Sequence, residues 1–146
     1  MRESPATCWP LLPADDVIIV TTPEPTAITD AYGIIKSIAV EDFEKNIKLV
    51  VNRVSSIAEA RKVAERIISI AHQFLSIKIY DAGFVYEDEA IGRAVRKRKP
   101  FVELYPNGRA AECIRRVAYR LENITGNDAY EPKGVKEFVK RFFGIS

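Results

Sequence analysis

The stretch that decides the fold is DDVIIVTTPEPTAITDAY, residues 15–32. It opens with the unbroken β-branched run Val17 to Val20, which is typical of a strand buried on both faces of a parallel sheet. Behind this run, Thr26 follows Pro25 and is the expected cap of a helix. Apolar residues then recur at helical spacing, at Ile28, Ala31, Tyr32, Ile35 and Ile38. The stretch therefore predicts a strand that turns tightly into an amphipathic helix.

The same strand–helix unit recurs twice along the chain. A second strand is expected at 47–51, followed by the capping box Ser56-Ile57-Ala58-Glu59 and a long apolar stripe. A third strand is expected at 77–86, and Asp88 and Glu89 open a third helix with acids in its first turn. Because strand–helix alternation requires right-handed crossovers, the predicted fold class is α/β, with a parallel sheet of three βα units and helices on both faces.

Composition bounds the kind of protein. The 146 residues are 47% hydrophobic, which is enough to bury the core of one ordinary domain. The formal net charge of +2 gives no global argument for a nucleic acid or a membrane as partner. No apolar run reaches the roughly 18 residues of a membrane span. Cys8 and Cys113 form no CxxC pair, so we expect a soluble cytosolic protein with reduced thiols, in which Cys113 is structural.

Several kinds of chemistry have no support in these residues. The sequence contains no GxxxxGK[ST] phosphate loop, no GxSxG elbow and no metal-ligand spacing. Its one histidine, His72, lies in a predicted helix without a nearby Cys or His partner. We therefore expect neither a catalytic residue nor a metal site within this chain.

Two polar turns follow predicted strands. The first, Thr21 to Thr26, lies beyond the carboxyl end of a strand, where open α/β sheets bind ligands. The second is Asn52-Arg53, in which an amide can read the edge of a purine and a flat guanidinium can stack on a base or hold a phosphate. The alternative for both is structural: a rigid turn capped by Thr26, and an Asn that serves only the turn.

The C-terminal segment 134–146 follows a turn-rich linker, 123–133, and is predicted to form an amphipathic helix. Its apolar residues fall on one side: Val135, Phe138, Val139, Phe142 and Phe143. Cations flank that side: Lys136, Lys140 and Arg141. Phenylalanines with flanking cations suit a helix that lies in a membrane surface, although the same face could pack onto the domain.

A basic run closes the third predicted helix, at Arg93 and Arg96-Lys97-Arg98-Lys99. Cations at a helix C-terminus meet the negative end of its dipole, and no aromatic residues interleave with this run. A solvated helix end explains the run better than a nucleic-acid site, so nucleic acid is an unlikely partner.

These features occur together, in order, in a family that the chain resembles. Residues 15–32, the run Val50-Val51-Asn52-Arg53-Val54, the segments 83–90 and 93–101, and the phenylalanine-rich tail resemble the C-terminal half of MinD/ParA-type P-loop ATPases. The resemblance is greatest to the branch that regulates flagellar number, called FlhG, FleN or YlxH. It covers roughly residue 15 to the end, and residues 1–14 match nothing.

The resemblance implies a nucleotide site and two interfaces. Asn52 would read adenine with Arg53 beside it, and Val85, Tyr86 and Asp88 would form the other wall of the pocket. Family members usually carry proline where Tyr86 stands. Glu24 would lie near the dimer interface that forms over bound nucleotide. The tail would bind the inner face of the cytoplasmic membrane, which makes the protein cytoplasmic and peripherally membrane-associated, and the partners would be ATP and a second copy or a flagellar GTPase.

The resemblance also defines what the chain lacks. Relatives begin with a lysine-bearing phosphate loop and two switch segments, and this sequence starts after them, so we expect a truncated, split or frameshifted product. ATP binding would then be weak or lost and hydrolysis absent, with Mg²⁺ expected only in full-length relatives. The alternative function is a non-enzymatic membrane- or partner-binding module with a vestigial nucleotide site. The expected organisation is an unmatched segment 1–14, an ATPase half-domain 15–122, the linker and the tail helix.

Overall fold

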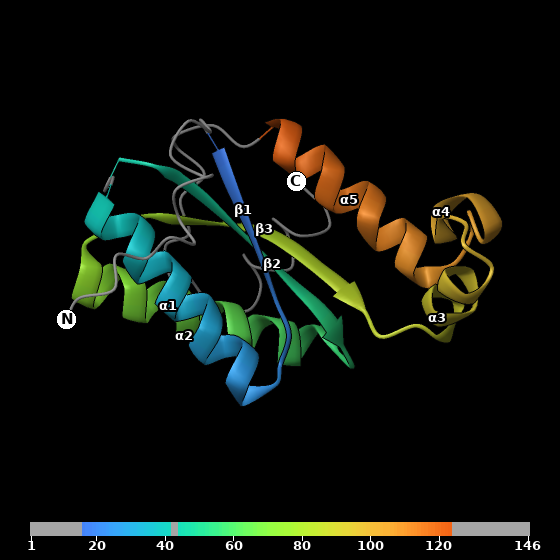
Figure 1. Ribbon diagram of the computed structural model, residues 1–146, viewed down its shortest axis with the longest axis horizontal. Coiled ribbons are helices and arrows are strands. Elements are labelled where there is room, and N and C mark those ends of the chain that lie inside the picture. Colours follow the sequence, from blue (N-terminus) through green and yellow to red (C-terminus); the bar gives the residue numbers. More distant parts are fainter. Residues whose placement is uncertain (1–15, 42–43, 124–146) are drawn as a thin grey trace.

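The computed structural model describes residues 16–41 and 44–123. Within them, the strands β1 (Asp16–Thr21), β2 (Asn46–Val54) and β3 (Ile79–Tyr86) form one parallel sheet in the order β1-β2-β3 (Figure 1). Ile18 is aligned with Lys48 and Lys48 with Tyr80, so the strands run side by side over most of their length. The α/β prediction of a parallel sheet with three βα units is confirmed.

Helices cover the sheet on both sides. The helices α1 (Pro25–Glu41) and α2 (Ile57–Leu75) lie together on one face, and α5 (Arg109–Asn123) lies on the other face against β3 (Figure 1). The helix α3 (Glu89–Arg96) and the short α4 (Phe101–Leu104) lie beyond the end of β3, next to the start of α5. No helix within the described residues is both long enough and apolar enough to cross a membrane.

Local sequence sets the ends of the helices. The predicted cap of α2 is present, because Ser56 Oγ accepts from Glu59 N at 3.1 Å, but the Glu59 carboxylate reaches back one residue further than a capping box requires and accepts from Ser55 N at 2.7 Å. The prediction that Thr26 caps the first helix is wrong, because α1 begins at Pro25. Proline suits the first helical position, since its φ is already helical and its missing N–H leaves no donor unpaired.

The strand β1 is not buried on both faces as its β-branched run predicts. Its burial alternates, so that Val17 and Ile19 are buried whereas Ile18 is 49% and Val20 is 60% exposed. The helix α5 packs on β3, and no described helix covers the same face of the sheet over β1. The unbroken apolar run therefore reports the residues' β propensity here, and not burial on both sides.

The core lies between the sheet and the helices. Its largest fully buried side chains come from α1, α2, the strands and the approach to β3: Phe84, Ile35, Ile47, Leu49, Ile67, Ile77, Ile79, Val51 and Val54. Lys48 is buried on the other face of β2, and its Nζ lies 3.0 Å from Asp16 Oδ2. That pairing joins β1 to β2 and satisfies a charge that would otherwise be costly to bury.

The predicted N-terminal segment 1–14, the linker 123–133 and the tail helix 134–146 lie outside the described residues, apart from Asn123 at the end of α5.

Candidate functional site

Polar turns from all three strands meet at the C-terminal edge of the sheet. Glu24 follows β1, Asn52 and Arg53 lie near the end of β2, and Glu87 follows β3. The turn after β1 is held locally, because Glu24 N donates to Thr22 Oγ1 at 3.4 Å. In parallel α/β sheets this edge is where ligands bind, so these turns form the candidate site.

A bulge in β2 positions Asn52 and Arg53. The pairing of β2 with β3 shifts register between Val51 and Val54, and Arg53 adopts a left-handed conformation with φ of 60°. Asn52 Oδ1 accepts from Arg53 N at 2.9 Å, which stabilises this turn. This bond gives Asn52 a local structural role at the bulge, although Asn52 lies inside β2 and not in a turn after it as the sequence predicts. A carbonyl oxygen has two lone pairs, so Asn52 can also accept a hydrogen bond from a ligand while its amide nitrogen donates another.

Arg53 links the turns of all three strands electrostatically. Its Nε donates to Glu87 Oε2 at 2.8 Å, and its Nη1 lies 3.8 Å from Glu24 Oε1. The hydrogen bond from Arg53 to Glu87 raises the pKa of the guanidinium above its ordinary value, and the charges of Glu87 and Glu24 add to this effect. All three side chains are exposed, so the pairs contribute little stability, and Arg53 can exchange them for a ligand.

The residues at the end of β3 differ in what they can offer a ligand. Val85 is 3% exposed, so its side chain is not available to a ligand. Asp88 Oδ1 accepts from Ala90 N at 2.9 Å, and its Oδ2 accepts from Ala110 N at 3.3 Å. Asp88 thus caps α3 and fixes the start of α5, a structural role that the sequence reveals only in part.

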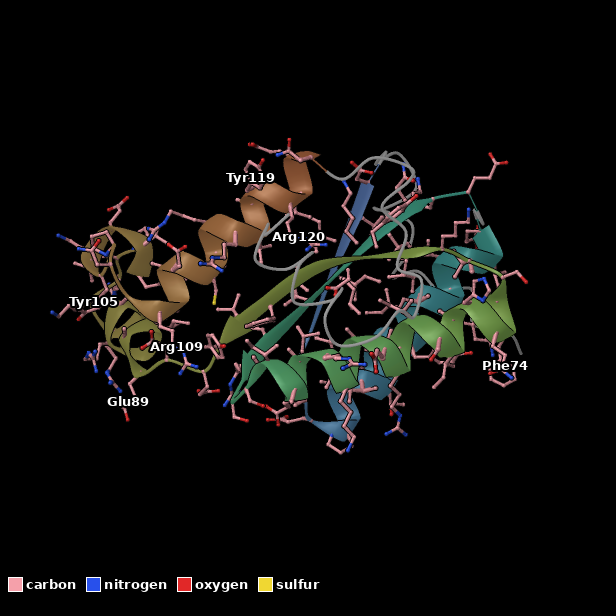
Figure 2. All side chains as sticks on the ribbon, turned by 180° about the vertical axis from the view of Figure 1, so that it is seen from behind. Phe74, Glu89, Tyr105, Arg109, Tyr119 and Arg120 are labelled. Carbon is pink, nitrogen blue, oxygen red and sulfur yellow. The ribbon has the colours of Figure 1, made fainter. Side chains whose placement is uncertain are left out.

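The ring of Tyr86 is covered by a residue that sequence reasoning does not single out. The Cζ atom of Arg109 lies 3.4 Å from the centroid of the Tyr86 ring, which is a close cation–π contact. Figure 2 shows Arg109 at the end of the molecule formed by α3, α4 and the start of α5. The contact joins positions 23 residues apart through the tertiary fold, so no local pattern signals it.

Cys113 lies behind this contact on α5. It is a buried free thiol, and burial raises its pKa above the ordinary value, an effect that a hydrogen bond from the backbone of Tyr86 offsets only in part. Its place among the buried core residues agrees with the structural role predicted for Cys113.

The basic run at the end of α3 is exposed. Arg93 forms an i,i+4 pair with Glu89 at 3.7 Å and lies over the ring of Tyr105, 5.3 Å from its centroid. Arg93 and Lys97 together lower the pKa of the Tyr105 hydroxyl. These contacts agree with the solvated helix end that the sequence predicts.

Comparisons with known proteins identify relatives over most of the chain. The flagellum site-determining protein YlxH of Helicobacter pylori is 36% identical over 131 residues, which cover 88% of this chain and 44% of the relative. The septum site-determining protein MinD of Bacillus subtilis is 33% identical over 135 residues, covering 90% and 49% of the two chains. An uncharacterized ATP-binding protein of Methanocaldococcus jannaschii is 29% identical over 134 residues, covering 90% and 48%.

The chain is similar to MinD-like proteins over most of its length, as the resemblance to the MinD/ParA family implies. It spans about half the length of the curated relatives that it matches. No family model matches it. The resemblance that the strand–turn–helix and Asn52-Arg53 indicate is therefore confirmed at the level of the family, and the partial parallel sheet is consistent with a P-loop NTPase fold.

A groove of this MinD-like chain lies away from the sheet edge. The helices α1 and α2 enclose a groove of ≈ 400 Å³, lined by Ile28, Thr29, Tyr32, Arg66, Ile67, Ile70 and Phe74. Phe74 marks the opposite end of the molecule from Arg109 (Figure 2).

Within the described residues, no group of three or more His, Cys, Asp or Glu side chains could hold a metal ion. The predicted membrane-binding residues between Val135 and Phe143 lie outside the described residues.

Proposed function

We propose that this chain supplies the base-recognition part of an adenine-nucleotide site in a MinD-like regulator of flagellar number or placement. The observation that carries the proposal is the convergence of Asn52, Arg53 and the end of β3 at the C-terminal edge of a parallel sheet. The relatives support it, since one is named as flagellum site-determining and another as ATP-binding.

Asn52 is the residue that distinguishes adenine in this proposal. Its amide oxygen accepts from the exocyclic amine of the base and its amide nitrogen donates to a ring nitrogen. Arg53, released from Glu87 or Glu24, stacks on the base or approaches a phosphate. Because the sequence contains no GxxxxGK[ST] loop, phosphate contacts are few, and we expect weak binding, with a Kd of about 1 mM. We expect this chain alone not to turn over ATP, and Mg²⁺ to take part only where a phosphate loop is present.

The substitution Asn52→Ala tests the proposal by isothermal calorimetry with ATP. We expect it to weaken ATP binding at least tenfold, about 1.4 kcal/mol, because both hydrogen bonds to the base are lost. Asn46→Ala is the matched control, since Asn46 is an exposed asparagine at the other end of β2. It should leave binding unchanged. Far-UV circular dichroism checks that both variants fold. A folded wild-type chain that does not bind ATP, or equal binding by both variants, would contradict the proposal.

We further propose that Glu24 lies at a homodimer interface and that the tail binds the cytoplasmic membrane peripherally. Glu24 is exposed beside Arg53, as an interface at the nucleotide edge requires. The tail combines three phenylalanines with Lys136, Lys140 and Arg141, the composition of an interfacial helix. The same feature favours the second candidate function, a non-enzymatic membrane- or partner-binding module in which Asn52 is vestigial.

Deletion of residues 134–146 is expected to abolish sedimentation with anionic liposomes while leaving the far-UV circular dichroism spectrum of the domain intact. The double substitution Phe142→Asp/Phe143→Asp is the matched variant that keeps the chain length, and it should also lose binding, because charged side chains cannot enter the interface. Unfolding of the deletion variant would show that the tail packs on the domain, and retained liposome binding would contradict the membrane role.

A further inference from the structure

We infer that Arg109 covers the base-binding face of Tyr86, so that a purine enters the site by displacing the Arg109 guanidinium. The inference rests on the proposed nucleotide site and adds a residue to it. The residue lies on α5, outside every segment that the sequence assigns to that site.

The first step is the stack itself. The ring of Tyr86 meets the ring of Phe84 edge to face, with centroids 5.1 Å apart and an interplanar angle of 79°. Phe84 is fully buried, so it holds the tyrosine ring in place from the core side. The Arg109 guanidinium lies over a face of that ring at 3.4 Å, which is the separation of two stacked planar groups. Arg109 therefore occupies the space that a stacked base would take.

The second step is the position of the ring. Tyr86 is the last residue of β3 and is paired with Val54 of β2, two positions after Asn52. The backbone also joins the two turns here, because Glu87 N donates to Val54 O at 2.9 Å. Tyr86 is thus an aromatic residue at this edge, directly before Glu87 and in register with the strand end that follows Asn52. Tyr86 is therefore, besides the guanidinium of Arg53, a candidate flat partner for a base held by Asn52, and Arg109 covers it.

The third step is the ease of displacement. Arg109 is exposed at the first position of α5, and within the described part of the chain no carboxylate lies at ion-pair distance from it. Its contact with Tyr86 is an exposed cation–π interaction, a weak class that a better-stacked ring can replace. The displaced guanidinium keeps its positive charge, which can attract the phosphates of a nucleotide. Adenosine carries no phosphate, so a change in its affinity reports whether Arg109 covers Tyr86 and not whether the arginine attracts a phosphate.

The test is an adenosine titration followed by NMR on the whole 146-residue chain. Removing an exposed cation–π competitor should tighten binding, so Arg109→Ala is expected to lower the Kd for adenosine about two- to fivefold. The control is Arg96→Ala, since Arg96 is an exposed arginine on α3, and it should leave the Kd for adenosine unchanged. In the double variant Arg109→Ala/Tyr86→Ala the gain should disappear, because the ring that Arg109 covered is gone.

The outcomes separate this inference from the proposed function. Binding that depends on Asn52 but is unchanged in Arg109→Ala overturns the inference alone. Weaker binding by Arg109→Ala also overturns it, because the base would then stack on the guanidinium. If neither the wild-type chain nor Arg109→Ala binds adenosine, both the inference and the proposed function are overturned. Binding that appears only in Arg109→Ala would be the strongest support, since the wild-type site would then be closed by its own arginine.

Discussion

Replacing Phe84 by alanine is expected to lower the free energy of unfolding by about 3–5 kcal/mol, the usual cost of emptying a buried phenylalanine site. Phe84 is 1% exposed and is the largest of the fully buried side chains of the core. Small domains have a net stability of about 5–15 kcal/mol, so this substitution removes a large part of it. The measurement is urea unfolding followed by circular dichroism.

The matched control for this prediction is Phe74→Ala. Phe74 lies on α2 and is 68% exposed, so its truncation should change the free energy of unfolding by no more than about 0.5 kcal/mol. Because Phe84 supports the ring of Tyr86, Phe84→Ala protein that remains folded should also bind adenosine less well than wild type. Equal destabilisation by the two substitutions would contradict the placement of the core.

The second large effect is expected at Gly83. This residue is buried in β3 and has a φ of 117°, a conformation that L side chains rarely adopt. Its N–H donates to Asp81 Oδ1 at 2.9 Å, where the register of β2 and β3 shifts. Gly83→Ala should therefore cost about 1–3 kcal/mol of backbone strain. It should also weaken ATP binding, because the register shift at Gly83 sets the positions of Tyr86 and Glu87 at the end of β3.

The control Gly33→Ala should have the opposite sign. Gly33 lies inside α1, and an added Cβ there meets nothing within 4 Å. Replacing a helical glycine by alanine should raise the free energy of unfolding by about 0.5–1 kcal/mol. Thermal melts of the two variants decide the matter, and destabilisation by Gly33→Ala together with stabilisation by Gly83→Ala would refute this account of β3.

Much of the fold follows from local sequence signals. The β-branched runs and the apolar stripes give the order of the strands and helices, because period and length distinguish the two kinds of element. The caps at Ser56 and Asp88 follow from side chains that bond to nearby backbone donors. Thr26 shows the limit of this reasoning. The helix begins at Pro25, one residue before the expected cap, because proline suits the first helical position.

The remainder depends on contacts between distant residues. The run Val17 to Val20 is equally apolar on its two faces, so the sequence gives no sign that Ile18 and Val20 are exposed. The ion pairs of Arg53 with Glu87 and Glu24 connect three turns, and the stack of Arg109 on Tyr86 connects β3 to α5. Such pairs arise only once the sheet brings its strand ends together. The sequence therefore identifies Asn52 and Arg53 as candidates, but not the ion pairs of Arg53 or the arginine that covers Tyr86.

The most direct test of the central claim, a base-recognition site at the C-terminal edge of the sheet, is NMR mapping of ATP on the isotopically labelled chain. The account predicts that the amide resonances of Asn52, Arg53 and Glu87 shift together with added ATP, while those of Ile70 and Phe74 in the groove between α1 and α2 do not. Shifts centred on that groove, or no shifts in a folded chain at ATP concentrations well above about 1 mM, would contradict it.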